Sequence, residues 1–371
     1  MDARVADPLV TGTPAAALGA LKSVLRGGKY QLPPLTRDYL LTYARDARTK
    51  KPKTNVSSST PPASPDGTEE VPAPAVSPTE YPRFDRLYTA GLNRIRRTPS
   101  AVFVGSEFPR RDKVKQGQIG DCYFLAVVGA MLNQDASAVR HMVTVKDDGS
   151  CDVRFPSGRV AKVARLSDAE IALASGSTGT GRWVAVLENA FGQARNDLRP
   201  DEDQKEVATD LIAKGGSPRA VIRLLTGHDV RLLLLRSRAS KALAPVESVA
   251  AKLPTVREAL TTTLNAKRLC AASTLSTLDL PPAINGKHAY TVVSYDAARD
   301  TVRIWNPHGN IFTPKGSAGL VNGYETQAGE FEMPLAEFVV TFNALTYETD
   351  KLYMPPTPKS GSKIVPTPGV K

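Results

Sequence analysis

The sequence predicts an α+β fold, with helices concentrated in the first half of a globular core and strands in the second. Two observations indicate this division. Between residues 121 and 227, apolar side chains recur at helical spacing and lie between recognisable helix starts and stops. From residue 288 onward, apolar and polar residues tend to alternate, as they do in strands.

The first half is expected to hold four helices and one hairpin. Ser217 stands at an N-cap position before Pro218, and Gly227 follows the last apolar residue, so one of these helices has both its start and its stop. Asp148 and Gly149 form the turn of the hairpin. The expected helices cover residues 121–133, 182–195, 200–216 and 217–227, and the hairpin covers residues 141–155.

The second half is expected to consist mainly of strands. The run "VRLLLLRS" predicts a buried strand, and residues 256–274 predict a helix followed by a strand. Residues 288–296 and 301–306 are joined by a short connection, which is typical of a β-hairpin. Residues 328–348 predict a strand, a short helix and a further strand.

Composition separates this core from both ends of the chain. Residues 1–49 carry two short helical signals and show no recognisable role. Residues 50–82 are rich in Pro, Ser and Thr and cannot bury enough apolar surface to form a core, which predicts a disordered linker. The expected globular core covers residues 83–350, and residues 351–371 form a Pro- and Lys-rich flexible tail.

Charge and cysteine content exclude several classes of protein. The net charge is +11, but the Lys and Arg residues are scattered and match no nucleic-acid-binding motif, so no specific nucleic-acid partner is expected. Three widely spaced cysteines without a CxxC pair predict neither a disulfide framework nor a zinc site. No secretory signal and no apolar stretch of about 18 residues is found, which predicts a cytoplasmic protein without a membrane span. Export by a route without a cleaved signal stays open.

Cys122 stands where a glycine-rich turn, "GQIGD", gives way to an apolar helical run. A thiol at a helix start is favoured as the reactive thiolate, and its own backbone N–H can form one half of an oxyanion hole. The amide of Gln116 or Gln118 is available as the second donor. The alternative is a small buried core residue. We give that interpretation to Cys151 and Cys270, because Cys151 lies on a hairpin strand and Cys270 in an apolar strand, and neither stands where a glycine-rich turn leads into a helix.

Among the four histidines, His288 is placed to act as a base. It begins the first strand of the expected late hairpin, and Asn306 ends the second strand. Antiparallel pairing brings the start of one strand beside the end of the next, so Asn306 is expected to hold the imidazole. His141 and His228 border elements without further polar context, and Asn306 alone would be interpreted as a turn residue. The order Cys122, His288, Asn306 predicts Cys-His-Asn acyl-transfer chemistry.

Several segments together resemble the catalytic core of calpain-type cysteine proteases. The run "QGQIGDCYFLA" resembles the family's Q-G-x-x-G-D-C-W-x-L-A, "GKHAYTV" its G-H-A-Y-S-V, and "IWNPHG" its R-N-P-W-G. The runs "WVAVLENAF" and "GEFEMPLAEFVVTF" are similar to its W-x-x-L-L-E-K-A-Y and G-E-F-W-M-x-x-x-D-F-x-x-x-F segments, and "KGGSP" resembles its Gly-Gly loop. The resemblance runs in order from about residue 100 to residue 348.

This resemblance implies a papain-like two-lobe fold, with a helical lobe over residues 83–215 and a β-rich lobe over residues 216–350. It implies an endopeptidase that hydrolyses polypeptide substrates in the cleft between the lobes. Cys122 would form a thioester intermediate, His288 would act as base, and Asn306 would orient the imidazole.

The resemblance also assigns residues that line the site. Gln116 takes the role of the oxyanion glutamine, which decides between the two glutamines of the turn. Gly215 and Gly216 match the glycines that let a substrate backbone approach, although a helix C-cap explains them as well.

Three residues beside the site depart from the family pattern. Tyr123 replaces the Trp that follows the nucleophile, and Lys287 places a bulky side chain directly before the base. His308 replaces the Trp that covers the contact between the base and Asn306, which predicts a more hydrated hydrogen bond unless Trp305 takes over the cover. His308 is also an alternative base.

Calcium is the cofactor that the resemblance raises, and the sequence predicts that it is not used. Lys113 and Ala328 stand where calpains carry acidic calcium ligands. Glu188 and Glu330 remain, but a calcium ion takes six or more oxygen ligands, and the chain has no EF-hand pattern. No metal and no other cofactor is therefore expected.

Two other functions remain open on the sequence. One is a catalytically silent peptide-binding module on the same fold. The other is a transglutaminase-like acyltransferase, in which Asp296 or Asp300 rather than an asparagine would orient the base. Residues 1–82 are expected to bind a partner, to target the protein or to block the cleft as a prosegment, with self-cleavage in the linker as a hypothesis.

Overall fold

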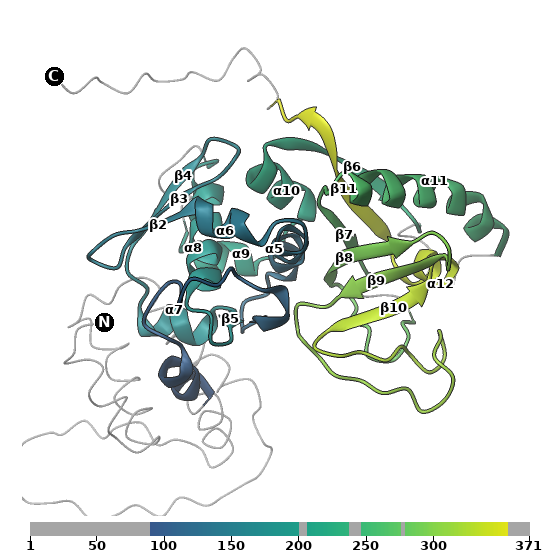
Figure 1. Cartoon of the computed structure of the whole chain (residues 1–371), viewed down its shortest axis with the longest axis horizontal. Helices are drawn as coiled ribbons and strands as arrows, with labels where there is room; N and C mark the ends of the chain where they lie inside the picture. The colour runs from purple at the N-terminus through teal and green to yellow at the C-terminus, as the bar shows by residue number, and fades with distance from the viewer. Residues whose placement is uncertain (1–89, 200–205, 237–245, 276–278, 355–371) are drawn as a thin grey trace, which may run out of the picture.

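The computed structural model describes residues 90–199, 206–236, 246–275 and 279–354, and within them it combines helices with antiparallel sheets (Figure 1). This confirms the expected α+β class. A helical half and a strand-rich half lie side by side, with helix α5 (Cys122–Gln134) of the first packed against the six-stranded sheet of the second (Figure 1). The expected N-terminal segment, the linker and all but the first residues of the tail lie outside the described residues.

Helix α5 is the centre of the helical half. Its side chains are buried without interruption from Tyr123 to Leu132, which explains the long apolar run in the sequence. Around it lie η1 (Arg111–Lys113), β1 (Val114–Lys115), α6 (Ala136–Met142), β2 (Val143–Val145), β3 (Cys151–Arg154), β4 (Val160–Val163), α7 (Asp168–Leu173), β5 (Gly176–Ser177), α8 (Trp183–Asn196), α9 (Ala208–Ala213) and α10 (Pro218–Thr226).

The ends of these elements follow the sequence signals. Ser217 caps α10 by accepting a backbone N–H two residues on, Pro218 occupies the first turn, and Gly227 ends the helix at φ +75°. The hairpin of β2 and β3 turns at Gly149, whose φ is +80°. The acidic start expected for α9 lies mostly outside the described residues, and the observed helix begins at Ala208.

The strand-rich half is built on one six-stranded sheet in which every neighbouring pair is antiparallel. The strand order is β10-β9-β8-β7-β11-β6, and the helices α11 and α12 pack against the sheet. The expected order of elements in this half is thus confirmed. Its elements are β6 (His228–Leu234), α11 (Val246–Asn265), β7 (Cys270–Ser273), β8 (Ala289–Asp296), β9 (Thr301–Trp305), β10 (Glu330–Pro334), α12 (Leu335–Thr341) and β11 (Ala344–Leu352).

The hairpin of β8 and β9 fixes two chain positions next to each other. Thr291 pairs with Trp305, and Asp296 pairs with Thr301 at the turn. The positions just before β8 and just after β9 therefore meet at the open end of the hairpin. These are the positions at which the sequence predicts the base and its partner.

Helix α5 packs on one face of this sheet, and α11 and α12 pack on the other (Figure 1). On the α5 side, the Thr291 hydroxyl donates to the Ala126 carbonyl at 2.5 Å. Gly129 lets the Trp305 ring approach, since a Cβ at Gly129 would lie 2.6 Å from that ring. Because both faces are covered, the first five residues of β8 are all buried rather than alternately exposed.

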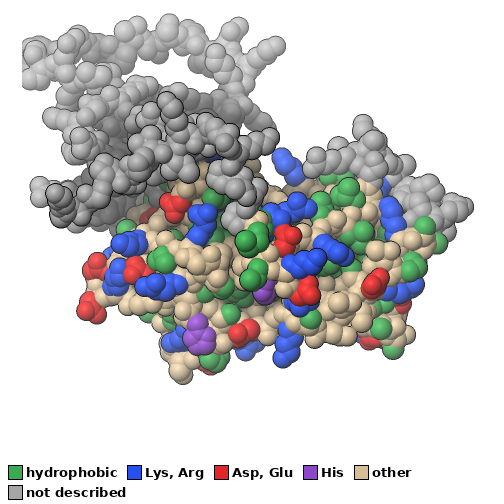
Figure 2. All heavy atoms as spheres, turned by 90° about the horizontal axis from the view of Figure 1, so that it is seen from above, with side chains coloured by type: hydrophobic (Ala, Val, Ile, Leu, Met, Phe, Trp, Pro, Cys, Tyr) green, Lys and Arg blue, Asp and Glu red, His purple; other side chains and the backbone are tan. Residues whose placement is uncertain are grey.

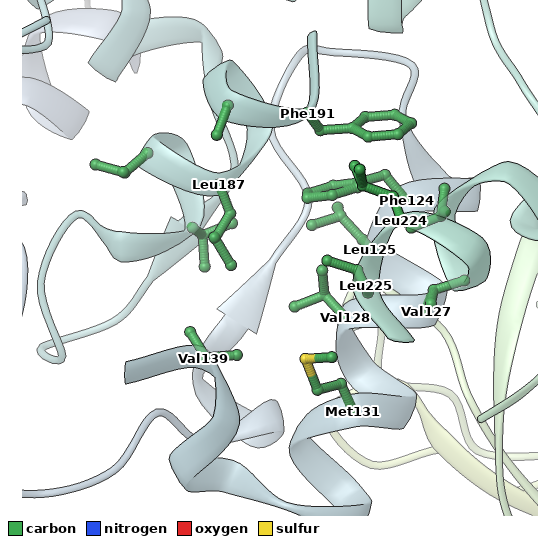
Figure 3. Close-up of a cluster of buried hydrophobic side chains, with 14 of the residues drawn as sticks. Phe124, Leu125, Val127, Val128, Met131, Val139, Leu187, Phe191, Leu224 and Leu225 are labelled. Carbon is green, nitrogen blue, oxygen red and sulfur yellow. The ribbon is translucent and has the colours of Figure 1, made fainter. Parts of the chain in front are cut away.

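Two clusters of buried hydrophobic side chains form the core. The first surrounds α5, where the Phe124 and Phe191 rings stack at 4.8 Å and Leu224 and Leu225 of α10 pack nearby (Figure 3). The second lies between the sheet and the helices α11 and α12. Helix α10 thus packs with the helical half, although it follows the boundary that the sequence predicts after residue 215.

Strand β6 differs from the expectation of a buried strand. The side chains of Leu232 and Leu234 are 46% and 59% exposed. The reason is position, because among the described residues β6 is an edge strand that pairs only with β11. On that partner strand, Lys351 and Leu352 still belong to β11, so the strand continues two residues into the segment expected to be a flexible tail.

The surface carries charges of both signs. Figure 2 shows Lys and Arg side chains interspersed with Asp and Glu over one face, which matches the scattered charge that the sequence predicts. In the part of the chain that the structure describes, no single helix is long and apolar enough to cross a membrane. The bent pair α5 and α6 passes that test only when the two helices are counted together, and by length and composition alone.

Candidate active site

The turn before α5 is held by close backbone contacts. Gly117 donates its N–H to Ser175 Oγ at 3.1 Å, and a Cβ at Gly117 would lie 2.2 Å from the Ala174 carbonyl oxygen. Only glycine fits at that distance. The segment that follows α7 thus fixes the turn, and Cys122 comes directly after the turn as the first residue of α5.

The thiol of Cys122 lies beside the start of β8. The backbone N–H of Ala289, the residue after His288, donates to this thiol. Burial raises the pKa of Cys122, and the Ala289 N–H acts in the opposite direction. The sequence predicts a thiolate favoured by the helix start, but in the folded protein desolvation outweighs that preference. The folded environment thus shifts Cys122 towards the neutral thiol.

The imidazole of His288 is held by Asn306, with Nε2 2.8 Å from Oδ1. The orientation of this amide is fixed, because the His308 backbone N–H donates to the same Oδ1 at 3.0 Å and Asn306 Nδ2 donates to Asn285 Oδ1 at 3.0 Å. An amide oxygen only accepts, so we assign the ring proton to Nε2. His288 Nδ1 is then the nitrogen that can take a proton.

This hydrogen bond is shielded from water. The side chains of His288 and Asn306 are 6% and 1% exposed. The ring centroid of His308 lies 4.3 Å from that of His288, and the Tyr290 ring meets His288 edge-on at 4.9 Å. The more hydrated bond expected from the replacement at position 308 is therefore not observed. Trp305 is not needed as a substitute cover, and its ring packs against α5 instead.

Burial lowers the pKa of His288 to about 4, the charge of His308 acts in the same direction, and the Asn306 hydrogen bond opposes both. The imidazole is therefore neutral at pH 7. Among the described residues no acceptor holds the His308 ring, so His308 lacks the orientation that His288 has as a base. Lys287, directly before the base, adopts φ +52° and is exposed.

Gln116 lies close to the nucleophile, but its amide is turned towards its own loop. Its Nε2 donates to the Ile119 carbonyl at 2.9 Å and lies 3.4 Å from Asp121 Oδ1. Its backbone N–H donates to the Pro307 carbonyl at 2.8 Å, which ties this segment to the end of β9. Gln118 is exposed. An oxyanion contact from Gln116 thus requires that one of the two present contacts is exchanged.

Asp121 and Glu188 form a buried carboxyl pair next to Cys122, which no sequence pattern predicts. Neither side chain is exposed. Burial raises the pKa of Glu188, while the Ser175 N–H, which both Glu188 oxygens accept at 3.0 Å, and the charge of Arg94 act in the opposite direction. Burial and the neighbouring Glu188 raise the pKa of Asp121 well above its usual value. The Ser175 N–H and the charge of Arg94 both favour the charged form of Glu188.

The two glycines of the expected substrate loop have different structural reasons. Gly215 has φ +86°, and its N–H donates to the Ile212 carbonyl at 3.1 Å, so it ends α9 as a C-cap glycine does. A Cβ at Gly215 would meet nothing within 4 Å. Gly216 is required by a close contact, since a Cβ there would lie 2.4 Å from the Tyr123 ring.

The acidic residues considered as calcium ligands are engaged by arginines. Glu330 forms an ion pair with Arg111 and lies 3.5 Å from Arg303. Glu188 is held by the contacts just described. Among the described residues, no group of three or more His, Cys, Asp or Glu side chains is arranged to hold a metal ion.

Asp296 and Asp300, the carboxylates of the acyltransferase alternative, lie at the turn end of the β8–β9 hairpin. Asp296 pairs with Arg299 at 2.7 Å, and Asp300 pairs with Arg257 at 2.7 Å. The open end of the hairpin carries His288, whose ring partner is an asparagine. The geometry thus offers no carboxylate orienter from this pair.

No protein-family model matches the chain, and no curated protein sequence matches it either. Its function is therefore inferred from the geometry of Cys122, His288 and Asn306 and from the residues around them. Two supporting groups were not predicted: Asn285, which holds the Asn306 amide, and the carboxyl pair beside the nucleophile. Both depend on contacts in space for which the sequence carries no spacing signal.

Proposed function

We propose that this chain is a cysteine endopeptidase with a papain-like fold similar to the calpain catalytic core. The observation that carries the proposal is the hydrogen bond between His288 Nε2 and Asn306 Oδ1, which leaves His288 Nδ1 as the nitrogen that can accept a proton. The residue after His288, Ala289, contacts the Cys122 thiol through its backbone N–H. The separate core clusters around α5 and behind the sheet support a two-lobe architecture.

The first half of the reaction forms a thioester. The Cys122 proton moves from Sγ to His288 Nδ1 while the sulfur attacks the carbonyl carbon of the scissile peptide bond. The Cys122 N–H and the Gln116 amide, once exchanged from its loop contacts, stabilise the oxygen of the tetrahedral intermediate. His288 then returns the proton to the leaving nitrogen, the C–N bond breaks, and the amine product departs.

The second half of the reaction restores the enzyme. His288 Nδ1 takes a proton from a water molecule, whose oxygen attacks the thioester carbon. The C–S bond breaks, the acid product leaves, and the proton returns to Cys122. Asn306 holds Nε2–H throughout, so the ring keeps the tautomer and orientation that both halves need.

We also propose that this activity does not use calcium. The two acidic residues that the resemblance relates to calcium ligands are occupied, since Glu188 accepts the Ser175 N–H and Glu330 pairs with Arg111. Peptidase activity is expected to be unchanged by a calcium chelator. Activity that disappears with the chelator and returns on adding calcium would contradict this proposal.

The function is tested by comparing the parent chain with Cys122→Ala on fluorescently labelled, unfolded casein. The parent is expected to release peptides and the variant is expected to be inactive. Cys151→Ala is the matched control, because Cys151 is buried on β3 away from the turn and its loss is expected to leave activity in place. Equal cleavage by the parent and by Cys122→Ala would overturn the proposal.

Two further measurements separate the alternatives. Iodoacetamide labelling of the native chain, mapped by mass spectrometry, is expected to modify Cys122 before the buried Cys151 and Cys270. No labelling at Cys122 and no cleavage would identify a silent peptide-binding module. Incorporation of a fluorescent amine into glutamine side chains without hydrolysis would identify the acyltransferase.

A further inference from the structure

The residue directly after the nucleophile lies under the substrate loop. Tyr123 is 4% exposed, and its ring is so close to Gly216 that a Cβ there would lie 2.4 Å from it. The same ring meets Phe191 edge-on at a centroid distance of 6.0 Å. The buried Tyr123 ring, one residue away from Cys122, therefore packs directly against the loop formed by Gly215 and Gly216.

The hydroxyl of Tyr123 is part of a network that holds the loop from below. Arg195 Nη1 donates to the Tyr123 hydroxyl at 2.7 Å, and this hydroxyl donates to the Ile212 carbonyl at 3.1 Å. The same Nη1 donates to the Leu211 and Gly215 carbonyls at 3.1 and 3.2 Å. One guanidinium and one phenol thus engage the last carbonyls of α9 together with the first glycine of the loop.

This network leaves the backbone N–H and carbonyl of Gly216 available to pair with a ligand. Gly216 is exposed, and neither its N–H nor its carbonyl has a hydrogen-bond partner among the described residues. Its neighbour Gly215 already gives its N–H to Ile212 and its carbonyl to Arg195. An unpaired exposed N–H and carbonyl in one residue is the pattern by which an extended peptide adds to a backbone edge.

We propose that Tyr123 and Arg195 are positioning residues that hold Gly216 where an extended polypeptide substrate can pair with it. The inference deepens the proposed peptidase function and rests on it. Tyr123 sets the position of Gly216 through ring contact, and Arg195 sets the orientation of the loop backbone by donating to the Gly215 carbonyl. Neither residue touches the reacting atoms, so both act on substrate binding through the loop.

The test uses Tyr123→Phe and Arg195→Gln in the full chain, with a fluorogenic peptide taken from a site that the parent cleaves in unfolded casein. Removing the hydroxyl or the guanidinium breaks the hydrogen bonds that orient the loop, so KM is expected to rise about tenfold while kcat changes less than about twofold. The double variant is expected to match the worse single variant, because both residues belong to one network.

Two controls make the result specific. Tyr324→Phe removes a different buried tyrosine hydroxyl, which donates to Glu337, and is expected to leave KM unchanged. Iodoacetamide labelling of Cys122 does not require the loop, so its rate is expected to be the same in the parent and in both loop variants. A fall in kcat and in labelling rate with KM unchanged would overturn the inference, because it would show that the two residues support Cys122 rather than the loop.

A parent chain without peptidase activity would contradict the proposed function but would still test the loop. In that case the probe is the same labelled casein, and its binding is followed by fluorescence anisotropy. Weaker binding by Tyr123→Phe and Arg195→Gln, with unchanged binding by Tyr324→Phe, would support the positioning role in a binding module. Equal binding by all four chains would overturn it.

Discussion

The two sides of the proposed active site, the base side around His288 and the nucleophile side around Cys122, are held in different ways. His288 and Asn306 are 18 residues apart, belong to one hairpin, and leave both polar atoms of the Asn306 side chain with partners. The nucleophile side depends on contacts between residues 58 to 165 positions apart. There, Gln116 Oε1 and Asp121 Oδ2 are buried without a hydrogen-bond partner.

This difference shows which side of the site is rigid and which can adjust. A fully hydrogen-bonded, buried pair has one preferred arrangement, so the base side is preorganised. Buried acceptors without partners are costly, so the nucleophile side is the one that gains when a ligand or a rearranged amide supplies new contacts. Substitutions on the nucleophile side, and where α5 packs on the sheet, should act by moving Cys122 relative to His288. Substitutions on the base side should act by changing the orientation or the pKa of the His288 imidazole.

The strongest expected effect is at the junction of the two sides. Gly129→Ala places a Cβ where it would lie 2.6 Å from both Thr291 Oγ1 and the Trp305 ring, so α5 must shift away from β8 and carry Cys122 away from His288. The free energy of unfolding is expected to fall by about 1–3 kcal/mol. Peptidase activity is expected to fall about 100-fold, because small misplacements of reacting groups are costly.

Denaturant unfolding and hydrolysis of the casein peptide measure the two effects. Gly316→Ala is the matched control, since Gly316 is exposed and the three atoms nearest to its new Cβ all belong to the side chain of Asn322. If Gly129→Ala kept full activity, the packing of α5 on the sheet would not set the distance between the two sides.

The next effect breaks the base side alone. Asn306→Ala removes the acceptor for His288 Nε2–H and leaves the His308 N–H without its bond to Oδ1. Because the imidazole loses its orientation, kcat is expected to fall by about 10- to 100-fold with little change in KM. Asn322→Ala, on a surface loop, is the control, and a large rise in KM for Asn306→Ala would argue against a purely orienting role.

A smaller effect tests whether Asp121 carries the proton of the Asp121–Glu188 carboxyl pair. Asp121→Asn keeps the shape and the hydrogen bonds of a protonated carboxyl group, so it is expected to change the unfolding free energy and the activity only slightly. Asp121→Ala removes the neighbour of a buried carboxylate, Glu188, and is expected to cost about 1–3 kcal/mol of unfolding free energy. Measurements at pH 7 compare the two, and equal damage by both would mean that Asp121 is charged in the folded protein.

The smallest effect is a shift along the pH axis. The pKa of His288 is lowered from 6.5 to about 4 by burial and by His308, so kcat/KM is expected to fall only as the pH drops through about 4. In the window between 6.5 and 4 the unfolded chain binds a proton that the folded chain does not, so stability falls as the pH falls through that window.

His308→Phe sharpens this prediction. The phenyl ring keeps the cover over His288 and removes the like charge, so the pKa of His288 rises and the acid limb of the kcat/KM profile moves to higher pH. The stability loss on acidification begins from the same unfolded-state pKa and is smaller in total. An acid limb that stays at the same pH would show that the charge of His308 does not change the pKa of His288.

Much of the framework was predictable because its signals are local. The caps of α10 stand in three residues, Ser217, Pro218 and Gly227, and the structure places them as predicted. The proximity of His288 and Asn306 follows from one short connection between two alternating segments. Strand β6 was predicted less well, because an apolar run cannot show whether a strand lies at the centre of a sheet or at its edge.

Local signals in the sequence are enough to predict the order of the elements, the turn that precedes Cys122 and the hairpin that brings His288 to Asn306. The remaining properties depend on contacts between distant segments, because those contacts set which groups are buried. Such contacts raise the pKa of the Cys122 thiol, lower that of His288, and pair Asp121 with Glu188. They also bring Arg195 into contact with the Gly215 carbonyl and with Tyr123, which lies 72 residues away along the chain.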